Sequence, residues 1–174
     1  MFEKFFTYHT LLIMICASVP ENEADRLAAL RRILMLDTPP EERFDRIVEF
    51  AAKEFDVPIA LISLVESDRQ WFKAKVGLTV CETPRSISFC AHAILSHEFT
   101  IIPDATLDPR FSGNPLVIGG PRIKFYAGAP LELHDGQRIG MLCLIDTVPR
   151  TLDALDLAVL STLRDLVVSE LEPQ

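Results

Sequence analysis

The spacing of apolar residues predicts two consecutive helices in the first third of the chain. In the first helix, Leu27, Leu30 and Leu34 recur at helical spacing after Asn22, a candidate N-cap. Residues 38–41 are Thr-Pro-Pro-Glu, a capping box with proline at the first helical position, and they predict that the second helix begins there. Its buried face is expected to comprise Phe44, Ile47, Val48, Ala51 and Phe55.

Two β-hairpins are predicted, one on each side of the middle of the chain. Residues 59–65 are almost continuously apolar and rich in β-branched side chains, which indicates a strand buried on both faces. Apolar and polar side chains alternate through residues 69–76, as in a half-buried strand paired with the first. The second hairpin joins residues 123–133 to residues 138–145, and Asp135-Gly136 is a strong signal for its turn.

The segment between the hairpins is irregular and punctuated by proline. Residues 89–95 are expected to form a short helix and residues 99–102 a short strand. Residues 104–120 form a long polar connection. Long connections inside compact domains are usually functional, so this loop is a candidate for contact with a ligand.

A long helix is expected to follow Thr151, which is its candidate cap. The apolar stripe of this helix is wider than one face of a sheet requires. The surplus indicates that a helix of a second subunit packs on it, so we expect a homodimer. The stripe consists of Leu152, Leu155, Val159, Leu163 and Leu166, broadened by Leu160, Val167 and Leu171.

The order of these elements predicts an α+β fold with a central antiparallel sheet of five to six strands. The terminal helices are expected to pack on one face of the sheet. Because the strand at 59–65 is apolar on both sides, the irregular middle segment has to cover the other face, and loops with a short helix can enclose a small-molecule cavity there. The domain is expected to span residues 22–171, with an apolar extension at 1–21 and a tail at 172–174.

Charge and cysteine usage narrow the classes of function. The net charge is −8 and the pI is about 5.0, which argues against non-specific binding to the nucleic-acid backbone. The four cysteines show no C-x-x-C pair and no zinc spacing. This usage is typical of a reducing compartment, so we expect a cytoplasmic protein.

An apolar segment at residues 5–19 offers an alternative localisation. It is shorter than the ~20 apolar residues that cross a bilayer, so no integral membrane span is expected. The segment is either a signal or membrane-associated segment, or else a packing extension or a misassigned start. A signal peptide would normally carry more positive charge before its apolar core.

Eight motifs follow one another along the chain, at Leu36–Glu41, Phe44–Ile47, Arg69–Lys73, Phe89–Ile94, Asp108–Phe111, Asn114–Val117, Phe125–Leu131 and Leu142–Asp146. Together they resemble the GAF domains, and more narrowly the subgroup found N-terminal in bacterial sensor histidine kinases and diguanylate cyclases. The resemblance implies a PAS-like fold and a sensory domain that dimerises through its terminal helices and passes ligand state to an output module. The sequence contains neither a G-G-[DE]-E-F signature nor kinase ATP-binding glycine boxes, so we expect no catalysis by this chain.

The loop-rich middle segment is expected to hold a ligand pocket against the sheet. Arginine and amide side chains there can orient an anionic or polar ligand. The alternative is that they tie the long loop to the sheet through backbone hydrogen bonds. The candidate pocket residues are Trp71, Arg85, Phe89, Cys90, His92, Asp104, Asp108, Arg110, Phe111, Asn114, Phe125 and Tyr126.

Two other functions are alternatives to a ligand-binding pocket. Cys81 and Cys90 flank a loop and suggest a redox enzyme similar to the free methionine-R-sulfoxide reductases, which are GAF proteins. A ligandless dimerisation module is the other alternative. The ligand stays unidentified, but we expect neither a bilin nor a haem: Cys90 and His92 would point about 200° apart on a helix. Asp104 and Asp108 are typical of caps and turns, so no metal is expected.

Overall fold

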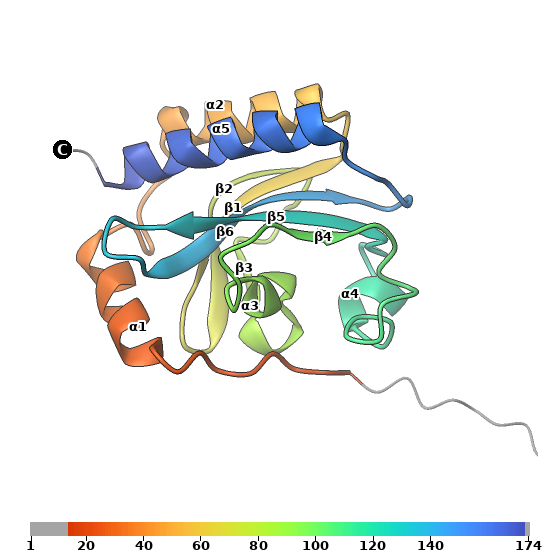
Figure 1. The fold of residues 1–174 in the computed structure, drawn as a ribbon, viewed down its shortest axis with the longest axis horizontal. Helices are drawn as coiled ribbons and strands as arrows, with labels where there is room; N and C mark the ends of the chain where they lie inside the picture. Colours follow the sequence, from red (N-terminus) through yellow and green to blue (C-terminus); the bar gives the residue numbers. More distant parts are fainter. Residues whose placement is uncertain (1–13, 173–174) are drawn as a thin grey trace, which may run out of the picture.

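A six-stranded antiparallel sheet in the order β3-β2-β1-β6-β5-β4 runs through the middle of the molecule (Figure 1). The structure is a computed structural model and describes residues 14–172. The predicted α+β fold with a central antiparallel sheet is confirmed. The strands are β1 (Ile59–Val65), β2 (Arg69–Val76), β3 (Glu82–Pro84), β4 (Thr100–Ile102), β5 (Phe125–Glu132) and β6 (Arg138–Asp146).

The central strand β1 is buried on both faces, as its unbroken apolar pattern predicts. All 7 of its residues are buried. Successive side chains of a strand alternate between the two faces of a sheet. Ile62 and Leu64 therefore belong to one core cluster, whereas Leu61 and Val65 belong to the other. Each face needs a covering layer, because a bare face would expose a continuous apolar surface to water.

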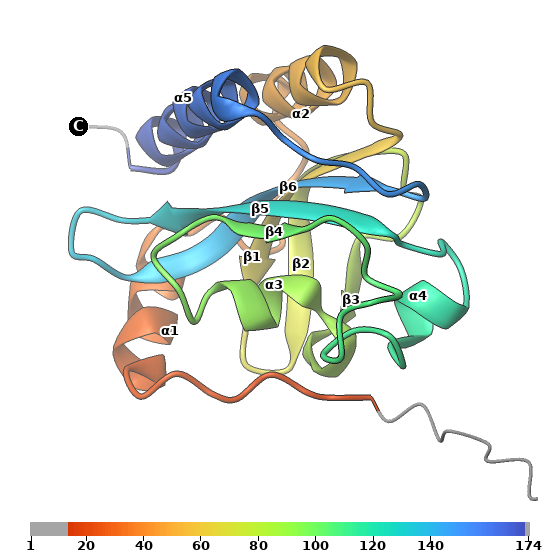
Figure 2. The ribbon, with the colours of Figure 1, turned by 45° about the vertical axis from the view of Figure 1, so that its right-hand side comes forward.

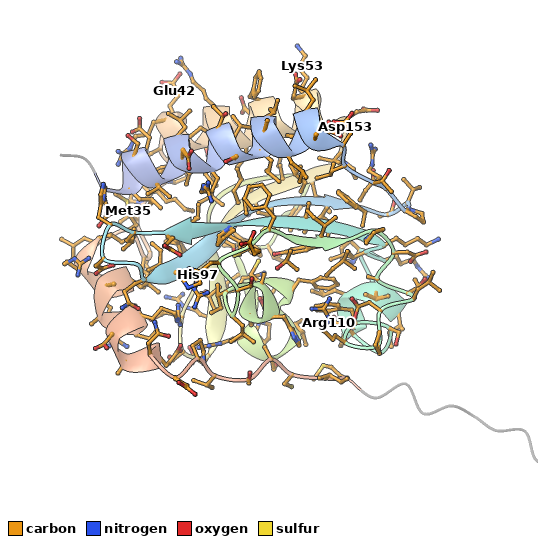
Figure 3. All side chains as sticks on the ribbon, in the orientation of Figure 1. Met35, Glu42, Lys53, His97, Arg110 and Asp153 are labelled. Carbon is orange, nitrogen blue, oxygen red and sulfur yellow. The ribbon has the colours of Figure 1, made fainter. Side chains whose placement is uncertain are left out.

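Two helices, α2 (Glu42–Glu54) and α5 (Ala154–Leu171), lie side by side over one face of the sheet (Figures 1 and 2). Glu42 and Lys53 project from the outer surface of α2 into solvent (Figure 3). The inner surface of α2 packs on β1 and β2. It consists of the predicted residues Phe44, Ile47, Val48 and Ala51, followed by Phe55 just after the helix.

The apolar stripe of α5 divides between two surfaces. Leu155 and Leu166 expose 72% and 46% of their surface, and they lie about three turns apart on one side of the helix. The chain, as described, leaves this strip uncovered. The residues of α5 that pack on the sheet and on α2 are Leu160, Leu163, Val167 and Leu171.

The predicted capping box before α2 is wrong. The helix begins at Glu42 with no side-chain cap. The Thr38 hydroxyl is used elsewhere: it donates to the Met35 carbonyl at 2.7 Å and accepts a hydrogen bond from Lys73 Nζ at 2.7 Å. A contact from a distant strand thus occupies the hydroxyl that the sequence assigns to the cap.

The predicted cap of the last helix is also displaced. Asp153, not Thr151, occupies the N-cap, and its carboxylate accepts the Asp156 N–H at 2.9 Å. The Asp156 carboxylate in turn accepts the Asp153 N–H at 2.9 Å. This reciprocal pair is the carboxylate version of a capping box.

Helix α1 (Glu23–Arg32) lies apart from the α2–α5 layer, beside β6 and the turn that joins β5 to β6 (Figure 1). The terminal helices α2 and α5 thus share one layer, whereas α1 lies outside it, although its buried Ala29 and Leu30 belong to the same core cluster. The helix also ends before Leu34, which the periodicity assigns to it. Leu34 has a φ of 54° and an exposed side chain.

The opposite face of the sheet is covered by the irregular middle of the chain, as predicted (Figure 2). This loop layer contains the 3₁₀ turn η1 (Arg85–Ile87), helix α3 (Phe89–Ala93) and helix α4 (Pro115–Ile118). Ser88 caps α3 by accepting the Ala91 N–H at 3.1 Å. The short strand β3 and helix α4 fall in segments expected to be irregular.

Most of the apolar segment at residues 5–19 lies outside the described residues, as do residues 173 and 174 of the tail at 172–174. Residues 14–20 run past α3 at the outer side of the loop layer (Figure 1). Among the described residues, no helix combines the length and hydrophobicity that a bilayer crossing requires.

Close approach of β1 and β6 makes Gly140 indispensable to the sheet. A Cβ at this position would lie 1.9 Å from the Ser63 carbonyl oxygen. We expect Gly140→Ala to lower the free energy of unfolding by about 3 kcal/mol, because backbone atoms have to move apart. Gly120→Ala is the control, since its Cβ would meet nothing within 4 Å. Urea unfolding of both variants checks this, and equal stabilities would contradict it.

Candidate functional site

An apolar cavity of about 300 Å³ lies between the sheet and the loop layer. Strands β1 and β2 form its floor, and the segments at 78–83 and 116–123 form its walls. Its size is at the lower end of the range for small-molecule sites. The lining residues are Ile59, Leu61, Gln70, Phe72, Leu78, Thr79, Val80, Thr83, Leu116, Gly120, Pro121, Ile123 and Ile145.

The polar side chains of this cavity are uncharged. Gln70 is held in place because its Nε2 donates to Thr83 Oγ1 at 3.2 Å and its Oε1 accepts a hydrogen bond from Ser88 Oγ. Thr79 supplies a further hydroxyl at the wall. Within the described part of the chain, no acidic or basic side chain lines the cavity. A charged ligand group would lose its hydration without gaining an ion-pair partner, so the cavity suits an uncharged molecule.

A β-bulge in β2 decides which of its side chains reach the cavity. Phe72 and Ala74 oppose consecutive residues of β1, so Lys73 between them is an extra residue. Phe72 consequently faces the loop layer, whereas Trp71 and Ala74 both face α2. Trp71, a predicted pocket residue, therefore packs on the helix face of the sheet, away from the cavity. Phe125 on β5, another predicted pocket residue, packs on the same face.

Three predicted pocket residues fill the centre of the loop face instead of lining a cavity. Phe89 and Phe111 stack with their ring centroids 4.1 Å apart and an interplanar angle of 10°. The Tyr126 ring lies 5.2 Å from that of Phe89. All three side chains are buried. This aromatic stack occupies the space where the sequence places the pocket, and the cavity lies beside it, toward β2.

Four predicted polar residues hold the long loop together. Asn114 caps α4, and its Nδ2 donates to the Ile87 carbonyl at 2.9 Å. Arg110 lies in the loop layer near α4 (Figure 3), and its hydrogen bond to Asp108 lowers the pKa of that carboxyl. Asp104 accepts the backbone N–H two residues further on at 3.0 Å. These contacts support the interpretation that the residues tie the loop down.

Cys90 and His92 have separate surroundings. Cys90 is buried, with its Sγ 3.3 Å from the Sγ of Cys143. His92 is partly exposed, and its Nε2–H donates to the Ile15 carbonyl at 3.0 Å. Burial lowers the pKa of His92. The histidine thus connects the segment before α1 to α3.

The cysteines proposed for a reductase-like reaction are not brought together. Cys81 is exposed, its Sγ lies 3.4 Å from Lys75 Nζ, and it lines a groove beside α2 together with Trp71. Cys90 lies in the core cluster beneath the loop layer. The structure pairs Cys90 with Cys143 instead.

Apolar residues in irregular segments are the signal that could have indicated the cavity walls. Leu78, Val80 and Leu116 lie outside the predicted helices and strands. Such side chains have to be covered by another part of the domain. Their pattern cannot say which part, because irregular segments have no fixed period.

Arg85, the remaining predicted residue, belongs to a buried ionic cluster at the end of the sheet. Its Nη1 contacts the Glu23 carboxylate and donates to the Glu66 carbonyl at 2.9 Å. The same carboxylate binds Arg26 at 2.8 Å, and Arg26 Nη1 donates to the Val65 carbonyl at 2.6 Å. The cluster fastens α1 to the β1–β2 turn.

Comparison with known proteins agrees with this fold. The GAF domain family model matches residues 39–171. A cyclic di-GMP phosphodiesterase of Pseudomonas aeruginosa is 46% identical over 153 residues, which cover 87% of this chain and 26% of that protein. Among solved structures, the GAF domain of an Acinetobacter phosphoenolpyruvate-protein phosphotransferase has a TM-score of 0.61 at 18% identity, covering 84% of this chain and 92% of that one. A type II free methionine-R-sulfoxide reductase from Thermoplasma acidophilum has a TM-score of 0.62 at 15% identity, with 82% and 94% covered.

The chain belongs to the GAF domain family, as the eight motifs indicate. It spans about a quarter of the length of the curated relative it matches. The two solved structures share the fold, and their identities are too low to carry a function to this chain. The narrower placement among kinase- and cyclase-associated domains stays a prediction.

The ionic cluster predicts an acid-dependent loss of stability. Burial alone would raise the pKa of Glu23, but the hydrogen bonds and charges of Arg26 and Arg85 lower it to about 2. Because the folded pKa lies below the ordinary value of 4.5, the stabilisation is complete above about pH 4.5 and disappears as the pH falls toward 2. We expect Glu23→Gln to cost about 2 kcal/mol at pH 7 and progressively less in acid.

Urea unfolding at a series of pH values measures this difference. The control is Glu21→Gln, which alters an exposed carboxylate just before α1. If the difference in the free energy of unfolding between the parent chain and Glu23→Gln stayed constant from pH 7 to pH 3, the ionic cluster would not be the source of the acid dependence.

Proposed function

We propose that this chain is a sensory GAF domain that binds a small, uncharged, mainly apolar molecule in the cavity over β1 and β2. The observation that carries the proposal is the cavity itself, with its apolar floor and its few uncharged polar groups. Gln70 and Thr83 are oriented by hydrogen bonds and can position one polar group of the ligand. The chain itself is proposed to be non-catalytic.

The proposed output is cyclic di-GMP signalling. Support comes from the Pseudomonas aeruginosa relative, whose name is that of a cyclic di-GMP phosphodiesterase. The dinucleotide itself does not suit the cavity, because its two phosphates would meet no basic side chain there. The domain would therefore regulate such an enzyme, joined to it or acting on it as a partner. A cytoplasmic location is part of the proposal, supported by four free cysteines.

Transmission to the output is proposed to run through the sheet into α2 and α5. Strands β1 and β2 carry the cavity on one face and α2 on the other. Arg43 Nη1 contacts the Glu170 carboxylate at 3.1 Å and so connects α2 to α5. The uncovered strip with Leu155 and Leu166 would pack on the same strip of a second copy. A shift of the floor strands on ligand binding would then change helix packing in a dimer.

Filling the cavity should abolish binding of an uncharged probe. Indole is a suitable probe because it is apolar, neutral and has one N–H donor. We expect millimolar indole to raise the melting temperature of the parent chain. In Leu116→Phe the larger ring occupies the cavity, so the affinity for indole should fall at least about tenfold and the rise in melting temperature should shrink accordingly. Leu116 lines the cavity, whereas Ile118 on the same helix is exposed.

Ile118→Phe is therefore the matched control, and it should bind indole like the parent chain. Loss of the response in both variants, or in neither, would argue against the cavity as the site. A parent chain that ignores indole and a panel of other neutral compounds would favour a ligandless dimerisation module.

Charge on the exposed strip of α5 should prevent dimerisation. We expect the parent chain to be a dimer and Leu155→Glu/Leu166→Glu to be a monomer at the same concentration, because two apolar strips pair through burial of their surface. Leu107→Glu, at a loop position exposed by 81%, is the control for adding charge. Size-exclusion chromatography with light scattering measures the mass. A monomeric parent chain would refute the dimer.

A further inference from the structure

Two buried thiols meet beneath α3, at a point where the loop layer rests on the sheet. Cys90 belongs to α3 and Cys143 to β6. Their Sγ atoms are 3.3 Å apart, and the two residues are exposed by 1% and 0%. Helix α3 and strand β6 are far apart in sequence, so only the tertiary fold creates this contact.

The thiols are surrounded by polar groups that simple packing does not require. The Tyr126 hydroxyl donates to Cys90 Sγ at 3.3 Å and lies 3.6 Å from Cys143 Sγ. Gly128 makes room for that hydroxyl, because a Cβ there would lie 2.5 Å from Tyr126 Oη. Ser63, the neighbour of Ile62 on β1, is also buried, and its Oγ has no hydrogen-bond partner among the described residues.

These groups differentiate the two sulfurs. Burial alone raises the pKa of a thiol. At Cys90, burial raises the pKa, but hydrogen bonds, the strongest of them with Cys143, outweigh it and lower the pKa. At Cys143, burial and the neighbouring Cys90 raise the pKa. The cluster thus contains one sulfur suited to attack as a thiolate and a second sulfur within reach of the first.

We infer that Cys90 and Cys143 form a redox-active dithiol that a hydroperoxide oxidises to a disulfide. The Cys90 thiol loses its proton, its thiolate attacks the terminal oxygen of the hydroperoxide, and the O–O bond breaks. The departing alkoxide takes up that proton and leaves as the alcohol (water, for hydrogen peroxide). The Cys143 sulfur then attacks the resulting sulfenic acid, an S–S bond forms, and water leaves with the Cys143 proton. Two thiols lose two electrons, and the peroxide gains them. The sulfurs have to approach from 3.3 Å to about 2.05 Å.

The bond would fasten the loop layer to the sheet. It links α3 covalently to β6, and Cys143 lies opposite Leu61, one of the residues on the floor of the cavity. Disulfides in reducing compartments are usually transient and redox-sensing. The site does not depend on the cavity ligand, so it can be tested whether or not indole binds.

The experiment uses the full chain with Cys16→Ser and Cys81→Ser, which removes the exposed thiols and leaves the buried pair. The protein is treated with hydrogen peroxide, denatured, alkylated with iodoacetamide and weighed by mass spectrometry. We expect the untreated protein to gain two alkyl groups. The treated protein should gain none and weigh two hydrogens less, and dithiothreitol should restore both alkylations.

Single variants identify the attacking sulfur. With Cys143→Ser added, dimedone should trap a sulfenic acid at Cys90, whereas with Cys90→Ser no adduct should form at Cys143. The intact pair keeps the test decisive if either single variant fails to fold. Two alkylatable thiols after peroxide treatment would overturn the proposal, and so would a mass increase of oxygen atoms without loss of two hydrogens.

Discussion

The structure depends on the burial of β1 and β6 on both faces. Every residue of β1 is buried, and from Ile139 onward so is every residue of β6. Such a pair of strands is stable only when both of its faces are covered. Regular helices cover one face, and irregular chain covers the other. The apolar cavity lies on the side of the irregular layer.

The loop layer combines three different environments on one face of the sheet. In the centre, the stacked rings of Phe89 and Phe111 fill the volume between the loop layer and the sheet. Toward β2, the layer stands off from the sheet and leaves the apolar cavity. Beneath α3, Cys90 and Cys143 meet beside the Tyr126 hydroxyl. A ligand in the cavity and a bond between the thiols would both act on how firmly this layer sits on the sheet, so the two proposals concern one mechanical element.

Membership of the GAF family defines a domain whose fold serves many roles, so the function has to be argued from the site. In this chain the lining of the cavity is apolar and uncharged. The polar residues that resembled a ligand site bind each other and the backbone instead: Asn114 caps a helix and Arg110 pairs with Asp108. A residue type suited to ligand binding is thus equally suited to holding a long loop, and only its contacts distinguish the two.

The sequence by itself determined the fold class, the order of five of the six strands along the chain, the buried face of α2 and the fact that loops cover one face. These follow from periodicity, because apolar spacing reports which side of an element avoids water. The tertiary structure alone decided that the Thr38 hydroxyl binds Lys73 instead of capping α2, and it alone produced the bulge at Lys73 and the contact of Cys90 with Cys143. Each arises from contacts between distant segments. The bulge is the clearest example. One extra residue moves the Trp71 side chain to the other face of the sheet, and an alternating apolar–polar pattern cannot predict where such a residue is inserted.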